Sequence, residues 1–217
     1  MPQQESPQET LAPSHGNNII DLPSSRPLRL ERAIAAFDSG DNSNELRIEL
    51  EELAKAGFSE ANYFLGCMFE DGTNGEVKNL QRALALYEKT AGSIGYLEAY
   101  LGIARLLYHG GDGVVRDYLR AKEIYEKILN YREHPVACFM LGRMYQHGQA
   151  GAENLSEAEA FFNRAISQGS VFGLINLSLL RSQQKRRFSS IWLRLKAAIA
   201  AYRIARINRH DVRLRGG

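Results

Sequence analysis

The sequence contains few of the residues on which disulfide-rich and metal-binding proteins depend. Its 217 residues include only two cysteines, Cys67 and Cys138. Two isolated cysteines make neither a disulfide framework nor a metal site, so the chain is expected to occupy a reducing compartment and to bind no metal. The N-terminus has no cationic start followed by an apolar stretch, which argues against a secretory signal. A cytoplasmic protein is the simplest interpretation.

Long apolar runs and catalytic motifs are also missing. The best candidate for a membrane span, residues 191–207, is interrupted by arginine and lysine and should not cross a bilayer. The glycine cluster at 110–113 lacks the Gly-Lys-Ser/Thr of a phosphate-binding loop. Adjacent carboxylates such as Glu70-Asp71 are not placed across a pocket. With no convergent nucleophile, base or metal-ligand set, the sequence predicts no enzyme and no cofactor.

Acidic residues become scarce toward the C-terminus. Residues 1–58 contain ten acids and five bases, and residues 59–170 contain fourteen acids and eleven bases. Residues 171–217 contain eleven Lys and Arg residues against a single acid, Asp211. This asymmetry indicates a basic segment that could meet an acidic protein, an anionic membrane surface or RNA.

A segment of about 38 residues occurs three times in the middle of the chain. Three sets of small residues follow this period: Ala61, Ala99 and Ala137; Gly72, Gly110 and Gly148; and, nearly in step, Ala83, Ala121 and Ala158. Such a period is typical of stacked supersecondary units and not of one closed core. Because the apolar spacing within each unit is helical, the predicted fold class is all-α, an α-solenoid of antiparallel helix pairs.

The recurring residues have distinct expected roles. Small residues in the first helix of each pair should let adjacent helices approach closely: Gly66, Ala104, Gly142 and Ser178. Small residues in the second helices should lie where each helix crosses its neighbour: Ala83, Ala121 and Ala158. Aromatic residues follow these alanines in the same helices and should supply the bulky half of the packing: Tyr87, Tyr125 and Phe162. The repeated glycines at 72, 110 and 148 should end the first helices. Polar residues should cap the second helices: Asn79, Asp117 and Asn154.

The pattern divides the chain into a repeat domain and two tails. Residues 1–26, rich in Pro, Gln, Ser and Asn, are expected to form a disordered N-terminal tail, and residues 209–217 a basic disordered C-terminal tail. The repeat domain is expected to cover residues 27–208. It would consist of a degenerate first pair at 27–58, repeats at 59–96, 97–134 and 135–170, and a capping pair at 171–208.

The three copies resemble the Sel-one-like repeat, a subfamily of the tetratricopeptide-like helical repeats. The pattern of that family is an alanine, then Leu-Gly and Met/Leu-Tyr, then Gly-x-Gly-Val-x-x-Asp, then Lys-Ala and an aromatic residue. The copies read ANYFLGCMFEDGTNGEVKNLQRALALYEK, AYLGIARLLYHGGDGVVRDYLRAKEIYEK and ACFMLGRMYQHGQAGAENLSEAEAFFNR. The middle copy has the clearest loop, although Ile103-Ala104 replaces Leu-Gly.

The resemblance implies a right-handed superhelix whose concave face is lined by the first helix of each pair. Members of the family act mainly as adaptors or scaffolds for protein complexes, often in bacterial signalling, envelope or exopolysaccharide systems. This chain is therefore expected to be a non-catalytic adaptor that binds a protein partner. It lacks the cysteine pair within each repeat of the secreted members, so their disulfide-stapled behaviour is not carried over.

If the first helices line a groove, two registers should face it. One comprises Tyr63, Leu101, Phe139 and Ile175, and the other, one turn on, comprises Cys67, Arg105, Arg143 and Leu179. The first register would hold apolar anchors of a peptide or helix, while Arg105 and Arg143 would pair with its carboxylates. Alternatively, the apolar register packs between repeats and the arginines are only solvated. The sequence leaves both possibilities open.

The C-terminal segment is the second candidate surface. One apolar stripe would comprise Trp192, Leu195, Ile199 and Tyr202, while Leu193, Ile204 and Ile207 lie on another side of the helix. Such a broad apolar surface is typical of a helix that closes the stack. The basic residues also allow residues 184–217 to tether an assembly factor to the inner face of an anionic membrane. Nucleic acid is not expected, because no recognised binding fold is present.

Overall fold

The computed structural model describes residues 27–41, 43–72, 78–184 and 187–207, and these residues form ten α-helices. The helices are α1 (Leu28–Asp38), α2 (Asn44–Lys55), α3 (Ser59–Asp71), α4 (Leu80–Ile94), α5 (Leu97–His109), α6 (Tyr118–Tyr131), α7 (Pro135–Gln146), α8 (Leu155–Ser167), α9 (Val171–Gln183) and α10 (Arg187–Ile207). The tails predicted at 1–26 and 209–217 lie outside the described residues.

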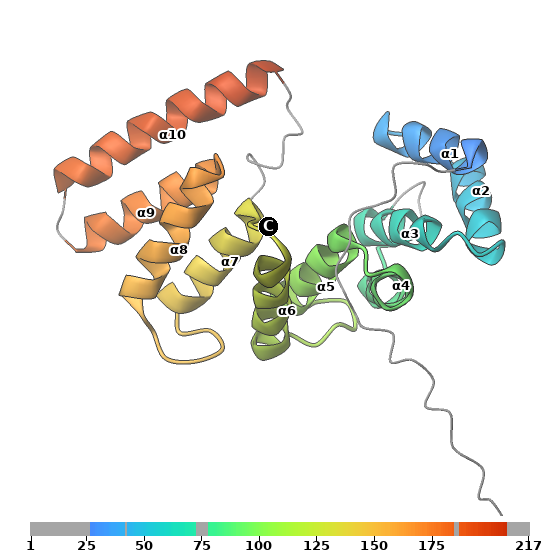
Figure 1. Cartoon of the computed structure of the whole chain (residues 1–217), viewed down its shortest axis with the longest axis horizontal. Helices are drawn as coiled ribbons and strands as arrows, with labels where there is room; N and C mark the ends of the chain where they lie inside the picture. Colours follow the sequence, from blue (N-terminus) through green and yellow to red (C-terminus); the bar gives the residue numbers. More distant parts are fainter. Residues whose placement is uncertain (1–26, 42, 73–77, 185–186, 208–217) are drawn as a thin grey trace, which may run out of the picture.

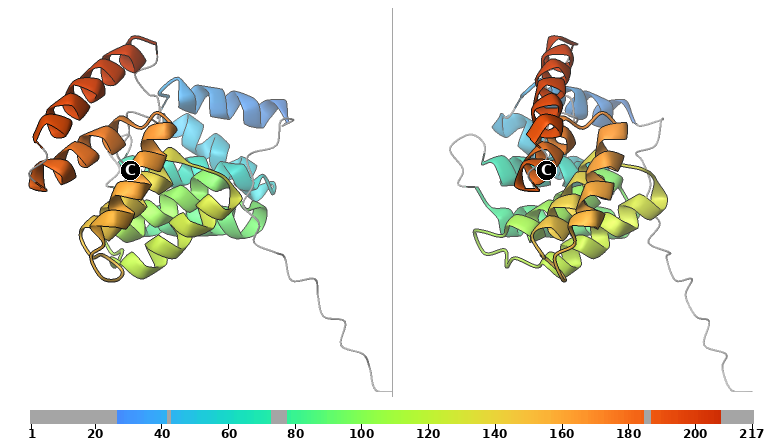
Figure 2. Two further views of the ribbon diagram at one scale, coloured as in Figure 1. Left: turned by 60° about the vertical axis from the view of Figure 1, so that its left-hand side comes forward. Right: turned by 90° about the vertical axis from the view of Figure 1, so that its left-hand side faces the viewer.

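The helices follow an arc, with α1 and α10 at its two ends and α5 and α6 near its middle (Figure 1). Each helix packs against its neighbours in sequence, most extensively in the pairs α3 with α4, α7 with α8, and α9 with α10. Along the arc, α3 and α5 lie on the inner side of α4 and α6 (Figure 1). Figure 2 shows α10 at one extreme of the molecule, beside α9. The predicted all-α array of sequential antiparallel pairs is thus confirmed.

The second helix of each central repeat begins at a capping side chain. Each capping oxygen accepts a hydrogen bond from the backbone N–H three residues further along the chain. The N···O distances are 2.8 Å at Asn79, 3.0 Å at Asp117 and 3.1 Å at Asn154. Gly72 and Gly110 end α3 and α5 with φ values of 72° and 66°, a region that favours glycine. These local signals explain why the helix boundaries fall at the same place in successive repeats.

Small and aromatic residues pack together between the helices. Gly66 and Gly102 lie against opposite edges of the Tyr87 ring, where an added Cβ would be 2.5 and 2.8 Å from the nearest ring atom. Gly142 lies against the Phe162 ring in the same way, and a Cβ added there would be 2.6 Å from the nearest ring atom. Because these separations are shorter than any ordinary van der Waals contact, only glycine permits this approach of the helices.

The core has two parts that meet at α3. One part joins α1, α2 and α3 through residues such as Leu30, Leu50 and Phe64, and the other extends from the end of α3 to α10. Tyr63 and Leu86 pack against both parts. The first helical pair is therefore continuous with the repeat array, although its sequence follows the repeat pattern only weakly.

Candidate partner-binding surface

The first predicted register is buried at some positions and exposed at others. Phe139 is only 2 % exposed, and its ring packs against those of Phe162 and Phe172, with centroids 6.2 and 5.8 Å apart. The ring of Tyr63 likewise packs against that of Tyr96, with centroids 4.9 Å apart. These two residues therefore pack between repeats, which is the alternative to groove binding considered above. Phe139 belongs to the core and is left out of the surface considered below.

The exposed part of the two registers lies toward the C-terminal end of the array. Ile175 and Leu179 on α9 are 38 and 44 % exposed. Leu101 on α5 and Arg143 on α7 are half-buried. We call these four residues the inner-face surface. It combines apolar side chains with a cation, and both kinds of residue are suited to gripping a polypeptide.

Arg105 is held by another residue of the protein. Its guanidinium forms a two-point ion pair with Glu70 on α3, in which one of the two N–H···O bonds measures 2.7 Å. The same carboxylate accepts a hydrogen bond from the Tyr87 hydroxyl at 2.8 Å. Glu70 is buried, so the pair is largely desolvated on the carboxylate side. Arg105 thus links α5 to α3 and α4, which limits its availability to a partner.

Cys67 belongs to the same cluster and shows no sign of a reactive thiol. The Tyr87 hydroxyl lies 3.4 Å from its Sγ. Burial raises the pKa of Cys67 above its usual range, although hydrogen bonds from Tyr87 and Tyr63 and the charge of Arg105 oppose this. A thiol with a raised pKa is largely protonated at neutral pH and is a poor nucleophile.

Arg143 lies in a different environment from Arg105. Its guanidinium carbon is 5.5 Å from the ring centroid of Tyr108 and 5.9 Å from that of Phe139. No carboxylate among the described residues pairs with it. Cation–π contacts at such distances are weak and leave the N–H donors available. Arg143 is therefore the arginine of the two that can bind an external carboxylate.

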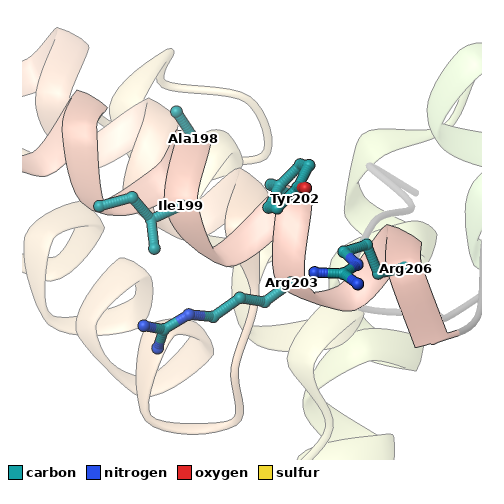
Figure 3. Close-up of a pocket in the computed structure, with 5 residues that line it drawn as sticks. All are labelled: Ala198, Ile199, Tyr202, Arg203 and Arg206. Atoms are coloured by element: carbon teal, nitrogen blue, oxygen red, sulfur yellow. The ribbon is translucent and has the colours of Figure 1, made fainter.

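The last helix buries one side and exposes another. Leu193 and Ala197 are 5 and 3 % exposed and lie in the core shared with α9. The exposed side, which we call the α10 face, carries an apolar stripe with exposures from 44 to 65 %: Trp192, Leu195, Ile199 and Tyr202. Figure 3 shows part of this face, where Arg203 and Arg206 extend beside Ile199 and Tyr202.

The sequence analysis did not identify Glu70 or the tyrosine hydroxyls as parts of a polar cluster. Glu70 was considered only together with its neighbour Asp71. A comparison of equivalent positions would have been more informative, because Glu70, Tyr108 and Gln146 are each 38 residues apart and only the first is acidic. The residue paired with Glu70, Arg105, is 35 residues away and comes from the next repeat.

In residues 27–207, apart from the undescribed positions, no group of three or more His, Cys, Asp or Glu side chains is placed to hold a metal ion. None of the helices described there is both long and apolar enough to span a membrane.

Comparisons with known proteins identify the repeats. The Sel1 repeat pattern matches residues 59–92, 97–128 and 135–170. These are the three copies found from the 38-residue period. The chain therefore belongs to the Sel1 repeat family, the Sel-one-like repeats named above. No match to a curated protein was found.

Solved structures share the fold. A Sel1 repeat protein from Oxalobacter formigenes superposes with a TM-score of 0.63 at 19 % identity, over 80 % of this chain and 74 % of that one. The antigen c5321 of uropathogenic Escherichia coli, which displays an SLR fold, gives a TM-score of 0.64 at 24 % identity, over 82 % of this chain and 40 % of that one. The immunity protein Pa5087 from Pseudomonas aeruginosa gives a TM-score of 0.54 at 17 % identity, over 88 % of this chain and 76 % of that one. At these identities the likeness concerns the fold alone.

Proposed function

We propose that this protein is a non-catalytic adaptor that binds a segment of a protein partner along its inner-face surface. Repeat arrays generally mediate protein interactions, because their stacked units present an extended surface. The observation that carries the proposal is the combination of the available Arg143 donors with the exposed Ile175 and Leu179 on the next first helix. A bacterial signalling, envelope or exopolysaccharide assembly is the setting that the family resemblance favours.

The inner-face surface has a rigid support. Phe139 and Tyr63, two members of the first register, are held by ring contacts with residues outside it. The ion pair of Arg105 with Glu70 joins two successive repeats. A preformed surface loses little conformational freedom when it binds, which leaves more of the interaction energy for affinity. These features support a docking role and provide no catalytic group.

Substituting Arg143→Glu and Leu179→Asp together should abolish partner capture. The first change reverses a charge, and the second places a carboxylate against an apolar anchor of the partner. The measurement is affinity purification of the tagged protein from its own cells, followed by quantitative mass spectrometry. Arg143 is preferred to Arg105 because a change at Arg105 would also break its ion pair with Glu70.

The matched control for this test is Arg120→Glu on α6. Arg120 pairs with Glu88 at an exposed position, and exposed pairs contribute little to stability. The control should capture the same proteins as the wild type. Undiminished capture by the double variant, with an unchanged circular dichroism spectrum and melting temperature, would exclude the inner-face surface as the docking site.

The α10 face supports a second candidate function, attachment to an anionic membrane surface. All ionised side chains described on α10 are basic, and two of them lie over aromatic rings of the apolar stripe. Lys196 is 3.7 Å from the Trp192 ring centroid. An exposed apolar stripe with tryptophan, tyrosine and flanking cations is typical of helices that lie in the membrane interface. In this role the chain would be a peripheral assembly factor.

The wild-type protein should sediment with phosphatidylglycerol vesicles at low salt and be released at high salt, since the attraction between exposed charges is screened. Leu195→Glu with Ile199→Glu should prevent sedimentation, because carboxylates replace apolar contacts with lipid. Val115→Glu, at an exposed loop position, serves as the control and should sediment normally. If the wild type stays in the supernatant even at low salt, the membrane role is wrong.

A further inference from the structure

A tyrosine hydroxyl, a carboxylate and an arginine form a closed polar cluster in the first repeat. The Tyr87 hydroxyl donates to Glu70, and Glu70 pairs with Arg105 of the next repeat. The cluster lies where α3, α4 and α5 meet. Each member is therefore paired with another, and the charge of Arg105 is already compensated within the protein.

Two of these three groups recur where the second repeat meets the third. Adding 38 to each number places Tyr125 at the position of Tyr87, Arg143 at that of Arg105, and Tyr108 at that of Glu70. Tyr108 provides no carboxylate, and its hydroxyl donates instead to Gln149 at 2.8 Å. The third repeat lacks the hydroxyl as well, because Phe162 replaces the tyrosine. Only the junction of the second and third repeats therefore has the donors without the acceptor.

Among the described residues, neither donor of this second cluster has a carboxylate partner. Tyr125 is fully buried, and its hydroxyl oxygen has no hydrogen-bond partner among the described residues. Leaving a buried hydroxyl unpaired is unfavourable. Burial raises the pKa of Tyr125, while the nearby Arg105 and Arg143 charges oppose the rise, so the hydroxyl keeps its proton and can donate it. Arg143 contributes only the ring contacts described above.

We propose that a carboxylate from the bound partner completes this cluster: an aspartate or glutamate side chain accepts hydrogen bonds from Arg143 and from the Tyr125 hydroxyl. The inference rests on the proposed adaptor function and names the chemistry of the partner, an acidic residue close to apolar anchors for Ile175 and Leu179. Because the hydroxyl is covered in the free protein, a side chain must move on binding. Arg143, held by ring contacts alone, is suited to that movement.

The test begins with a phage library of random peptides selected on the immobilised full-length protein. Selected peptides should be enriched in Asp or Glu beside apolar residues. In fluorescence anisotropy, changing the acidic residue of the best peptide to its amide should weaken binding about tenfold or more, because charge-assisted hydrogen bonds are lost. Arg143→Ala should weaken the acidic peptide similarly and the amide peptide far less. Arg120→Ala, the control, should leave both affinities unchanged.

A pair of tyrosine variants separates binding from stability. Tyr125→Phe should weaken the acidic peptide several-fold and leave the melting temperature unchanged or raised, since it removes an unpaired hydroxyl. Tyr87→Phe should lower the melting temperature, because it removes the bond to Glu70. If Tyr125→Phe and the amide peptide both bind as well as the originals, the carboxylate site is wrong.

The remaining outcomes distinguish this inference from the adaptor function. Peptides that lack acidic enrichment but lose binding on Leu179→Asp would overturn the carboxylate site and keep the inner-face surface. A selection that enriches no peptide, or enriches peptides that bind equally well to the double variant of Arg143 and Leu179, would count against both. Self-association in sedimentation that disappears with Arg143→Ala would identify a second copy as the occupant and overturn the peptide assignment.

Discussion

Replacing Tyr87 with alanine should lower the free energy of unfolding by about 3–5 kcal/mol, the usual cost of removing a large buried aromatic side chain. Tyr87 is fully buried and fits between Gly66 and Gly102, which carry no side chain that could fill the space. The substitution also removes one of the hydrogen-bond donors to the buried Glu70 carboxylate, the other being Arg105. Urea unfolding followed by far-ultraviolet circular dichroism, which reports helix content, measures the change.

The control for Tyr87→Ala is Tyr202→Ala. Tyr202 is an exposed tyrosine on α10, so its removal should change the free energy of unfolding by less than about 0.5 kcal/mol. Because each repeat contacts mainly its neighbours, Tyr87→Ala is also expected to loosen α3–α5 before the C-terminal helices. Equal stabilities of the two variants would show that the Tyr87 ring does not hold the repeats together.

Placing leucine at Gly142 should cost about 1–3 kcal/mol, because the new side chain overpacks the contact between α7 and α8. Its Cβ alone would lie 2.6 Å from the Phe162 ring and 3.3 Å from the backbone oxygen of Ala158. The ring has little room to move, since Phe162 is fully buried. Thermal and urea unfolding should both show the loss.

Gly92 provides the matched glycine for this experiment. It lies within α4, and a Cβ added there would have no atom within 4 Å. Gly92→Leu should therefore be neutral or slightly stabilising, because leucine has the higher helix propensity. Phe162→Leu should restore part of the stability lost in Gly142→Leu by making room. A Gly142→Leu protein as stable as the Gly92→Leu protein would contradict the close approach of α7 and α8.

Local sequence signals predicted the helical framework well. The caps at Asn79, Asp117 and Asn154 and the glycine that ends α5 act within a few residues of their own positions, so a linear pattern contains all the information they need. The 38-residue period similarly identified which small and aromatic residues meet. Most of these features depend on neighbours along the helix or in the adjacent helix of the same repeat, whereas the contact of Gly102 with Tyr87 joins two repeats.

The candidate surface was predictable only in part. The registers placed Phe139 and Ile175 at equivalent positions, yet the first is buried under the rings of Phe162 and Phe172 and the second is exposed. The sequence also treated Arg105 and Arg143 alike, whereas only Arg105 has an acidic partner among the described residues. Exposure and pairing depend on side chains from other repeats, which a register alone does not specify.

By itself, the sequence determined that this chain folds as stacked helical pairs, because periodicity, caps and stops act over short distances. It also fixed the basic character of the last helix. The tertiary structure alone decided which stripe of α10 stays exposed and which arginine is bound to Glu70. It also decided that the buried Tyr125 hydroxyl has no hydrogen-bond partner among the described residues. These properties arise where helices of different repeats meet, and they depend on three-dimensional distances that sequence separation does not reveal.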